Sequence, residues 1–212
     1  MAGKRLCLAV LVFATVFAGM AVGQDEKNEI GGMVGRIFIS DQGIRGASVP
    51  SIVAYGKGVT IEGSYARRFL VTPLFAVSGE ALVVYNPDED VNGGSYGNAI
   101  VPADLKQLFV TPAARLNLFP TTAVSPWVSL GAGFAHISEA NTLIYGGTNP
   151  GKSTTSGVLE GGFGLDVKVW KRLVLRGQVR DFWSGSPDFP LANTGKTRQH
   201  NYFVGGGVFW RF

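Results

Sequence analysis

The sequence predicts a single all-β domain, an eight-stranded antiparallel up-and-down β-barrel that crosses a membrane. Three observations support this fold class. Apolar and polar residues alternate with a period of two through eight separate segments. The connections between these segments are alternately short and long, as they are in a barrel whose hairpins have two different ends. The 30 glycines lie among aromatic and β-branched residues, and no long segment has a helical period.

The first 23 residues have the features of a secretory signal peptide. Lys4 and Arg5 precede an uncharged apolar run, and small residues lie just before Gln24. The run is shorter than the roughly 20 residues that a membrane helix needs, and no basic segment follows it. We therefore expect residues 1–23 to be removed and residues 24–212 to form the barrel domain.

Net charge and cysteine content argue against a nucleic-acid-binding protein and against a disulfide-stabilised one. The formal net charge is +4, and Lys4 and Arg5 of the leader contribute two of these charges, so a nucleic-acid partner is not indicated. Cys7 is the only cysteine and would leave with the leader. A disulfide framework is therefore not expected.

Each candidate strand has one apolar face and one polar or glycine-rich face. In residues 157–170, for example, Leu159, Phe163 and Leu165 share one face, whereas Glu160 and Asp166 share the other. Many of the segments approach the roughly 9 to 11 residues of a tilted membrane strand. The candidate strands are residues 31–39, 59–65, 75–84, 113–119, 125–135, 157–170, 172–183 and 201–212.

The connections predict which ends of the strands lie together. Short connections are expected near residues 66–69, 120–125 and 170–172, and long ones at residues 40–56, 86–104, 139–155 and 184–197. An even number of strands returns both chain termini to the end with the short turns. In an outer-membrane barrel the short turns are periplasmic and the long loops are extracellular.

The last candidate strand indicates what surrounds the apolar face of the barrel. Tyr202, Val204, Val208, Trp210 and Phe212 share that face. Aromatic side chains at the end of a membrane strand lie at the level of the lipid headgroups. We therefore predict that Trp210 and Phe212 anchor the strand at this interface and that lipid surrounds the apolar face.

The leader, the alternating connections and the terminal VFWRF together resemble small bacterial outer-membrane β-barrels of the OmpA-like and OmpX-like type. The resemblance implies a monomer in the bacterial outer membrane, in contact with the lipid bilayer and lipopolysaccharide. It also implies that Trp210 and Phe212 form the signal read by the barrel-assembly machinery. A non-catalytic, envelope-structural or surface-interaction role is expected, without a cofactor.

The inward face of the barrel is predicted to carry charges of both signs. A barrel of about eight strands has room inside only for side chains or one small ligand, so these charges must pair with one another. The expected lumen network consists of Arg36, Glu62, Glu80, Arg115, Glu160, Asp166, Lys168, Arg176, Arg180 and Arg211.

Two other functions remain open from the sequence. His136 and Ser138 reproduce the His-x-Ser spacing of outer-membrane lipid A deacylases, although about three strands follow them here, more than in that family. The second alternative is a soluble secreted barrel that binds a small apolar ligand.

Two loop motifs match known sites only in part. Asp88, Asp90, Asn92 and Gly93 fit the first half of a calcium loop, but Ala99 occupies the position of its bidentate glutamate. The segment GGTNPGKST fits a phosphate-binding loop, but its continuation is a poor helix former. We therefore expect no metal site and no nucleotide site.

Overall fold

The computed structural model describes residues 26–45, 52–56, 58–93, 100–150, 153–189, 191, 194–195 and 197–212. Cys7, the leader and the cleavage site lie outside these residues. The strands are β1 (Asn28–Ile39), β2 (Gln42–Gly43), β3 (Ile52–Tyr55), β4 (Val59–Val71), β5 (Phe75–Asn92), β6 (Asp104–Leu118), β7 (Val124–Glu139), β8 (Ser153–Lys168), β9 (Leu173–Gly185) and β10 (Arg198–Arg211). None of the described residues belongs to a helix long and apolar enough to cross a membrane.

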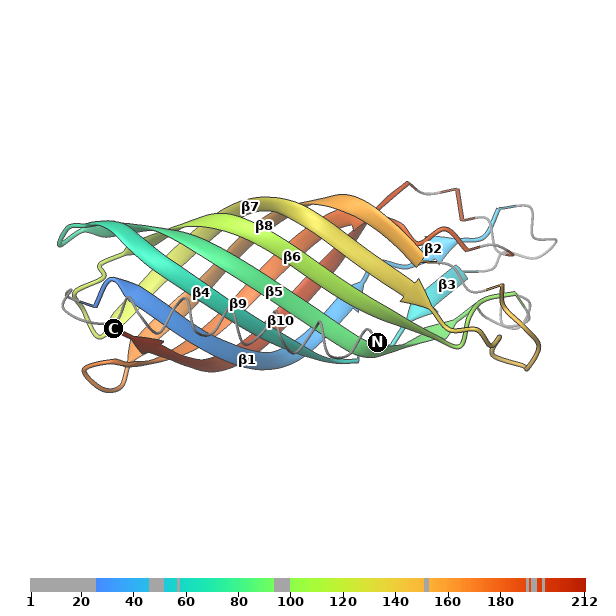
Figure 1. Ribbon diagram of the computed structural model, residues 1–212, viewed down its shortest axis with the longest axis horizontal. Helices are drawn as coiled ribbons and strands as arrows, with labels where there is room; N and C mark the ends of the chain where they lie inside the picture. The colour runs from blue at the N-terminus through green and yellow to red at the C-terminus, as the bar shows by residue number, and fades with distance from the viewer. Residues whose placement is uncertain are drawn as a thin grey trace, which may run out of the picture.

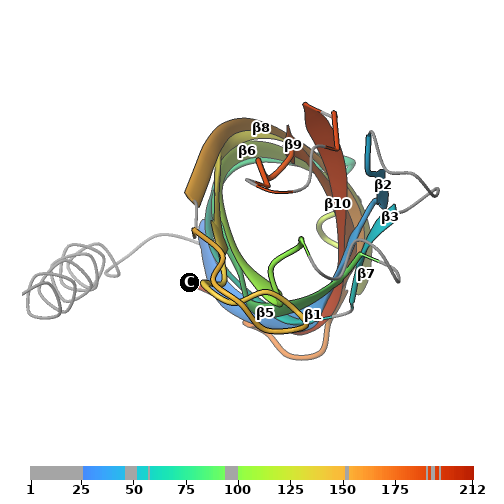
Figure 2. The same cartoon turned by 90° about the vertical axis from the view of Figure 1, so that its right-hand side faces the viewer.

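Eight of the strands form a closed antiparallel barrel. β1 pairs with β4, and each strand from β4 to β9 pairs with the next one along the chain. β10 then pairs with β1 and closes the ring (Figure 2). The predicted eight-stranded up-and-down barrel is therefore confirmed. Closure leaves these eight strands without an unpaired edge.

The two ends of the barrel differ as the sequence predicts. At one end, which we call the turn end, three short turns lie beside the C-terminus (Figure 1). The backbones of Asn28 and Phe212 exchange two hydrogen bonds there, each of 2.8 Å. The opposite end, which we call the loop end, carries the long connections together with β2 and β3 (Figure 1).

The turn predicted near residues 66–69 is wrong, because β4 continues to Val71. Phe69, Leu70 and Val71 are exposed apolar residues that extend the outer face of this strand past a register shift. The chain reverses only after Thr72, whose amide donates to the carbonyl of Phe75 over 2.8 Å. The other two short turns lie within a few residues of the predicted positions.

The predicted loop at residues 86–104 is also partly strand. β5 runs to Asn92 and carries Asp88 and Asp90 beyond the last exposed apolar residue of its outer face, Tyr85. β3 pairs with this extension through Ala54 and Tyr55. A second apolar core holds the loop end together, and its buried members are Val53, Val91, Val101, Leu105, Ile137 and Phe189.

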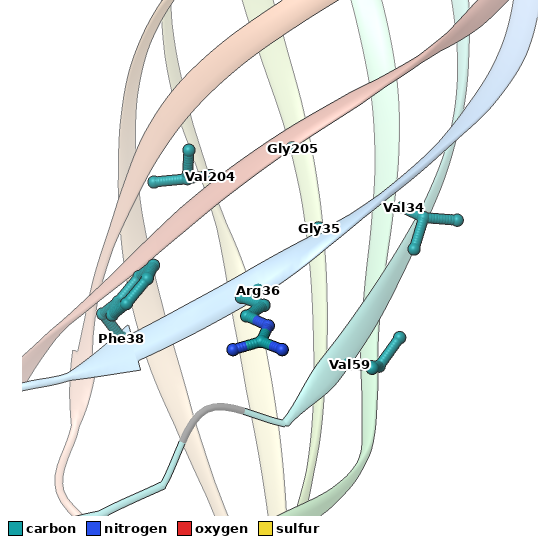
Figure 3. A pocket seen from close by; sticks show the side chains of 7 residues that line it. All are labelled: Val34, Gly35, Arg36, Phe38, Val59, Val204 and Gly205. Carbon is teal, nitrogen blue, oxygen red and sulfur yellow. The ribbon is translucent and has the colours of Figure 1, made fainter.

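The predicted position of Arg36 in the lumen is wrong. On β1 the residues Glu29, Met33 and Ile37 are buried in the barrel, and Arg36 is exposed on the outer face. Both faces of β1 carry apolar residues, so alternation alone leaves its orientation ambiguous. The ion pairs of Glu29, described below, place that face inside the barrel. Figure 3 shows Arg36 beside a groove on the outer surface, together with Val34 and Val59.

Candidate functional site: the charged lumen and its two mouths

Glu29, near the start of β1, is the centre of the lumen network. Its Oε1 accepts hydrogen bonds from Arg115 Nη2 at 2.7 Å and from Arg176 Nη2 at 2.6 Å. Its Oε2 accepts one from Arg211 Nε at 2.8 Å. Glu29 lies outside the predicted strand that begins at residue 31, so the sequence reading missed it. A longer strand alone would not have found it, because the predicted inward face of β1 was the one that carries Arg36, and Glu29 lies on the other face.

Glu80 on β5 lies at the middle of the same network. Its carboxylate accepts hydrogen bonds from Arg115 Nη1 at 3.1 Å and from Arg180 Nη2 at 2.8 Å. Arg176 Nη1 lies 3.6 Å away and forms a third ion pair. All four side chains have no exposed surface. A carboxylate with three guanidinium partners is the arrangement that compensates burial of charge.

Glu160 and Asp166, both on β8, hold the remaining sides of the arginine cluster. Glu160 Oε1 accepts from Arg180 Nη1 and from Ser129 Oγ, each at 2.8 Å. Asp166 receives Arg176 in a bidentate pair of 2.7 and 3.0 Å. It also accepts from Arg211 Nη2 at 2.8 Å. A bidentate pair of this kind fixes the relative orientation of the guanidinium and the carboxylate, and it also neutralises their charges.

The indole of Trp127 on β7 forms an aromatic wall beside this network. Trp127 is buried, and its Nε1 donates to Asp166 Oδ1 over 3.1 Å. The guanidinium carbons of Arg180 and Arg176 lie 4.9 and 5.4 Å from its ring centroid, within cation–π distance. Gly164 on β8 makes room for the indole, because a Cβ there would lie 2.5 Å from Trp127 Cζ2.

Predicted lumen residues also occupy the margins of the network. Glu62 is buried and accepts a short hydrogen bond from Gln178 Nε2, but none of the ion pairs among the described residues includes it. Lys168 lies at the turn-end mouth, where its side chain is 39% exposed and its Nζ is 3.9 Å from Glu26. Of the ten predicted lumen residues, only Arg36 is on the outer face.

An apolar layer fills the lumen on the loop-end side of the charges. Phe109 lies nearer the loop end of β6 than Arg115, and Phe182 nearer the loop end of β9 than Arg180. The two phenyl rings stack with centroids 4.9 Å apart. Other buried members of this layer are Met33, Ile37, Leu82, Val84, Ala135, Val158 and Phe203. Two further members of the same cluster, Val174 and Phe209, lie on the turn-end side of Arg176, so apolar side chains also pack among the charges.

The outer surface is an apolar belt with aromatic residues at both ends. At the turn end, Trp210 is 46% and Trp170 is 73% exposed, and the outward alternation of β10 reaches Phe212. At the loop end, Trp183 and Tyr202 are exposed. The barrel thus has an apolar outer belt, aromatic rims and a charged interior. A soluble barrel has the opposite arrangement, with its apolar face inside and its polar face outside.

His136 and Ser138 meet on the outer face near the loop end. Ser138 Oγ lies 3.3 Å from His136 Nε2, and His136 Nδ1 lies 2.8 Å from Thr155 Oγ1. Both ring nitrogens therefore have hydroxyl partners. The group that orients the imidazole is therefore the hydroxyl of Thr155, whereas the usual orienting group of a serine–histidine pair is a carboxylate.

The candidate calcium positions do not form a compact acidic cluster. Asp88, Asp90 and Asn92 are exposed residues of β5. Between them, Glu89 is buried, and its Oε2 accepts hydrogen bonds from Gly58 N at 3.0 Å and Asn86 Nδ2 at 2.6 Å. In the part of the chain that the structure describes, no group of three His, Cys, Asp or Glu residues is placed to hold a metal ion. Ala99 lies outside that part.

The fold and the outer surface together define the chain as a small transmembrane β-barrel of the kind found in bacterial outer membranes. No protein-family model and no curated protein matches the sequence. The fold is similar to Neisserial surface protein A, at a TM-score of 0.54 and 14% identity over 90% of this chain and 99% of that one. It is also similar to OprG from Pseudomonas aeruginosa, at 0.54 and 15% identity over 88% and 95% of the two chains. A third similar structure is AlkL in lipid bilayers, at 0.50 and 13% identity over 91% and 93%.

Proposed function

We propose that this protein is a non-catalytic outer-membrane barrel with a closed lumen, which displays its long connections outside the cell. The observation that supports this most directly is the filling of the lumen. Arg115, Arg176, Arg180 and Arg211 are all held by carboxylates from other strands, both neighbouring ones and ones across the lumen. The apolar layer then covers the same cross-section nearer the loop end. Side chains at these two levels of the barrel support a closed lumen rather than a continuous water-filled path.

Planar-bilayer recording on the purified protein tests this proposal. We expect the wild-type barrel to insert without a stable conducting state. A Glu80→Gln variant, in which three arginines lose a shared carboxylate, is the matched perturbation of the charged level. A stable open state of the wild type that passes small solutes would overturn the closed-lumen proposal in favour of a channel.

We also propose contact between the outer surface and lipopolysaccharide. Arg36 pairs in register with Val59, the first residue of β4, and therefore lies near the loop end. The adjacent groove of about 410 Å³ is lined mainly by apolar residues, including Val34 and Phe38 (Figure 3). A guanidinium above apolar side chains suits a phosphate attached to acyl chains. Less lipopolysaccharide is expected to copurify with Arg36→Gln than with the wild type, and equal amounts would refute this contact.

The hydrogen bond between Ser138 and His136 favours one second candidate, a lipid A deacylase. The pair faces outward, where an acyl chain in the membrane could reach it, and a serine needs a base within such a distance. Analysis of lipid A acyl chains in cells with and without the protein separates the two proposals. Loss of one acyl chain that depends on Ser138 would establish the enzyme and exclude the non-catalytic role.

A further inference from the structure

The mouth of the barrel at the turn end contains a pocket with an excess of positive charge. Its volume is about 570 Å³. Its lining includes four cationic side chains, Lys27, Arg68, Lys168 and Arg211, and one carboxylate, Glu26. The lumen network described above ends at this mouth, because Arg211 binds both Glu29 and Asp166.

Arg68 differs from the other buried arginines of the lumen. It is only 9% exposed, and its Nε and Nη2 are buried without a hydrogen-bond acceptor among the described residues. By contrast, Arg115, Arg176 and Arg180 each have at least two ion pairs. Burial of an unpaired guanidinium is unfavourable, because it loses water without gaining a partner. Among the described residues, Arg68 therefore lacks an acceptor, which an anion in the pocket would supply.

Glu62 is a lumen carboxylate without a guanidinium partner among the described residues, but it cannot supply this acceptor. Glu62 lies on the same inward face of β4, six residues before Arg68. Six residues of strand span roughly 20 Å, so the two side chains lie at different levels of the barrel. Gln178 already donates to Glu62. Among the described residues, Arg68 therefore forms no ion pair, although Arg211 and Lys168 at the same mouth have carboxylate partners.

Neighbouring cations add hydrogen-bond donors around Arg68. Lys27 is exposed, and the amide of Arg68 donates to its carbonyl over 2.7 Å, so the two residues are adjacent. The one ion pair of Lys168 within the described part of the chain is the 3.9 Å contact with Glu26, and both of these side chains are 39% exposed. The pocket therefore combines the ammonium groups of Lys27 and Lys168 with the buried guanidinium of Arg68. An anion with several oxygens could accept hydrogen bonds from all three.

We propose that this mouth pocket binds a phosphate group, with Arg68 and Lys27 as its principal donors and Lys168 as a further cation. A phosphate has enough acceptor oxygens to meet several donors at once, and the planar guanidinium binds two of them together. The phosphate has two possible sources. It is either free inorganic phosphate or the headgroup phosphate of a phospholipid in the leaflet that meets the turn end.

Titration of the folded mature chain in detergent tests the proposal. One arm uses inorganic phosphate at constant ionic strength, followed by ³¹P NMR and calorimetry. The other arm uses micelles that contain phosphatidylglycerol. Saturable binding in the first arm identifies free phosphate as a sufficient ligand, and saturable binding in the second arm alone identifies the headgroup. The proposal is overturned if the wild type shows saturable binding in neither arm.

Variants locate the site. We expect Arg68→Gln to weaken binding about tenfold or more, because it removes charge-assisted hydrogen bonds. Lys27→Gln keeps the claim testable if Arg68→Gln fails to fold, because Lys27 is exposed; here we expect a loss of about threefold. Lys171→Gln is the matched control, since Lys171 is an exposed cation at the same end outside the pocket. The mouth pocket is not the site if Arg68→Gln and Lys27→Gln both bind phosphate as tightly as the wild type. It is also not the site if Lys171→Gln loses as much affinity as they do.

Discussion

Replacing Glu80 by glutamine is expected to destabilise the barrel strongly while leaving its shape unchanged. Glu80 accepts two charge-assisted hydrogen bonds, from Arg115 Nη1 at 3.1 Å and Arg180 Nη2 at 2.8 Å. Arg176 is a third cation at 3.6 Å. The glutamine amide is neutral and presents its own donors to these guanidinium groups. Their charges therefore stay buried with less compensation.

The size of the effect follows from these contacts. Hydrogen bonds to charged groups contribute about 1.5 to 3 kcal/mol each, and breaking one partner of a buried ion pair costs about 3 to 5 kcal/mol. Because Arg115 and Arg180 retain Glu29 and Glu160 as partners, we expect a loss of about 3 to 5 kcal/mol in the free energy of unfolding.

Glu62→Gln is the matched control for this experiment. Glu62 is buried at a similar depth in the lumen wall, but its hydrogen bond comes from the neutral side chain of Gln178. The same chemical change breaks no ion pair, so we expect less than about 1 kcal/mol of change in the free energy of unfolding.

Urea unfolding of the barrel in lipid vesicles measures both variants. Tryptophan fluorescence follows the transition, since Trp127 lies inside the network, and the gel mobility of unboiled samples reports the folded fraction. If Glu80→Gln and Glu62→Gln unfold at the same urea concentration, the ion pairs of Glu80 do not stabilise the lumen as argued.

Three further results are expected. Phe212→Ser is expected to reduce insertion into the outer membrane more than it reduces the stability of protein already folded in detergent; normal membrane levels would contradict the role of Phe212 in assembly. Trypsin added to intact cells is expected to cut only in the long connections, so cleavage after Arg172 from outside would reverse the orientation. Burial raises the pKa of Glu89, which lies beyond the apolar belt. Because the folded state binds this proton more tightly than the unfolded chain does, the free energy of any opening that exposes Glu89 should fall as pH rises from about 4.3, the ordinary carboxyl value, through the raised one. Hydrogen exchange at the Gly58 amide, corrected for intrinsic rates, measures this, and Glu89→Gln should abolish the pH dependence.

The sequence by itself determined the fold class, the approximate strand positions and most of the inward charges. Period-two alternation decides orientation wherever one face is charged and the other apolar, as on β8 and β9, because only one of those faces can meet lipid. The same signal places Trp210 on the outer face.

Only the tertiary structure decided the orientation of β1 and the partners of each charge. On β1 both faces are largely apolar, so the choice between Arg36 and Glu29 depends on arginines that come from strands β6, β9 and β10. Local sequence carries no information about those distant partners. The unpaired guanidinium of Arg68 is likewise a property of the assembled mouth. The sequence shows that the positive and negative lumen charges can balance. Closure of the barrel decides which of them lie close enough to form ion pairs.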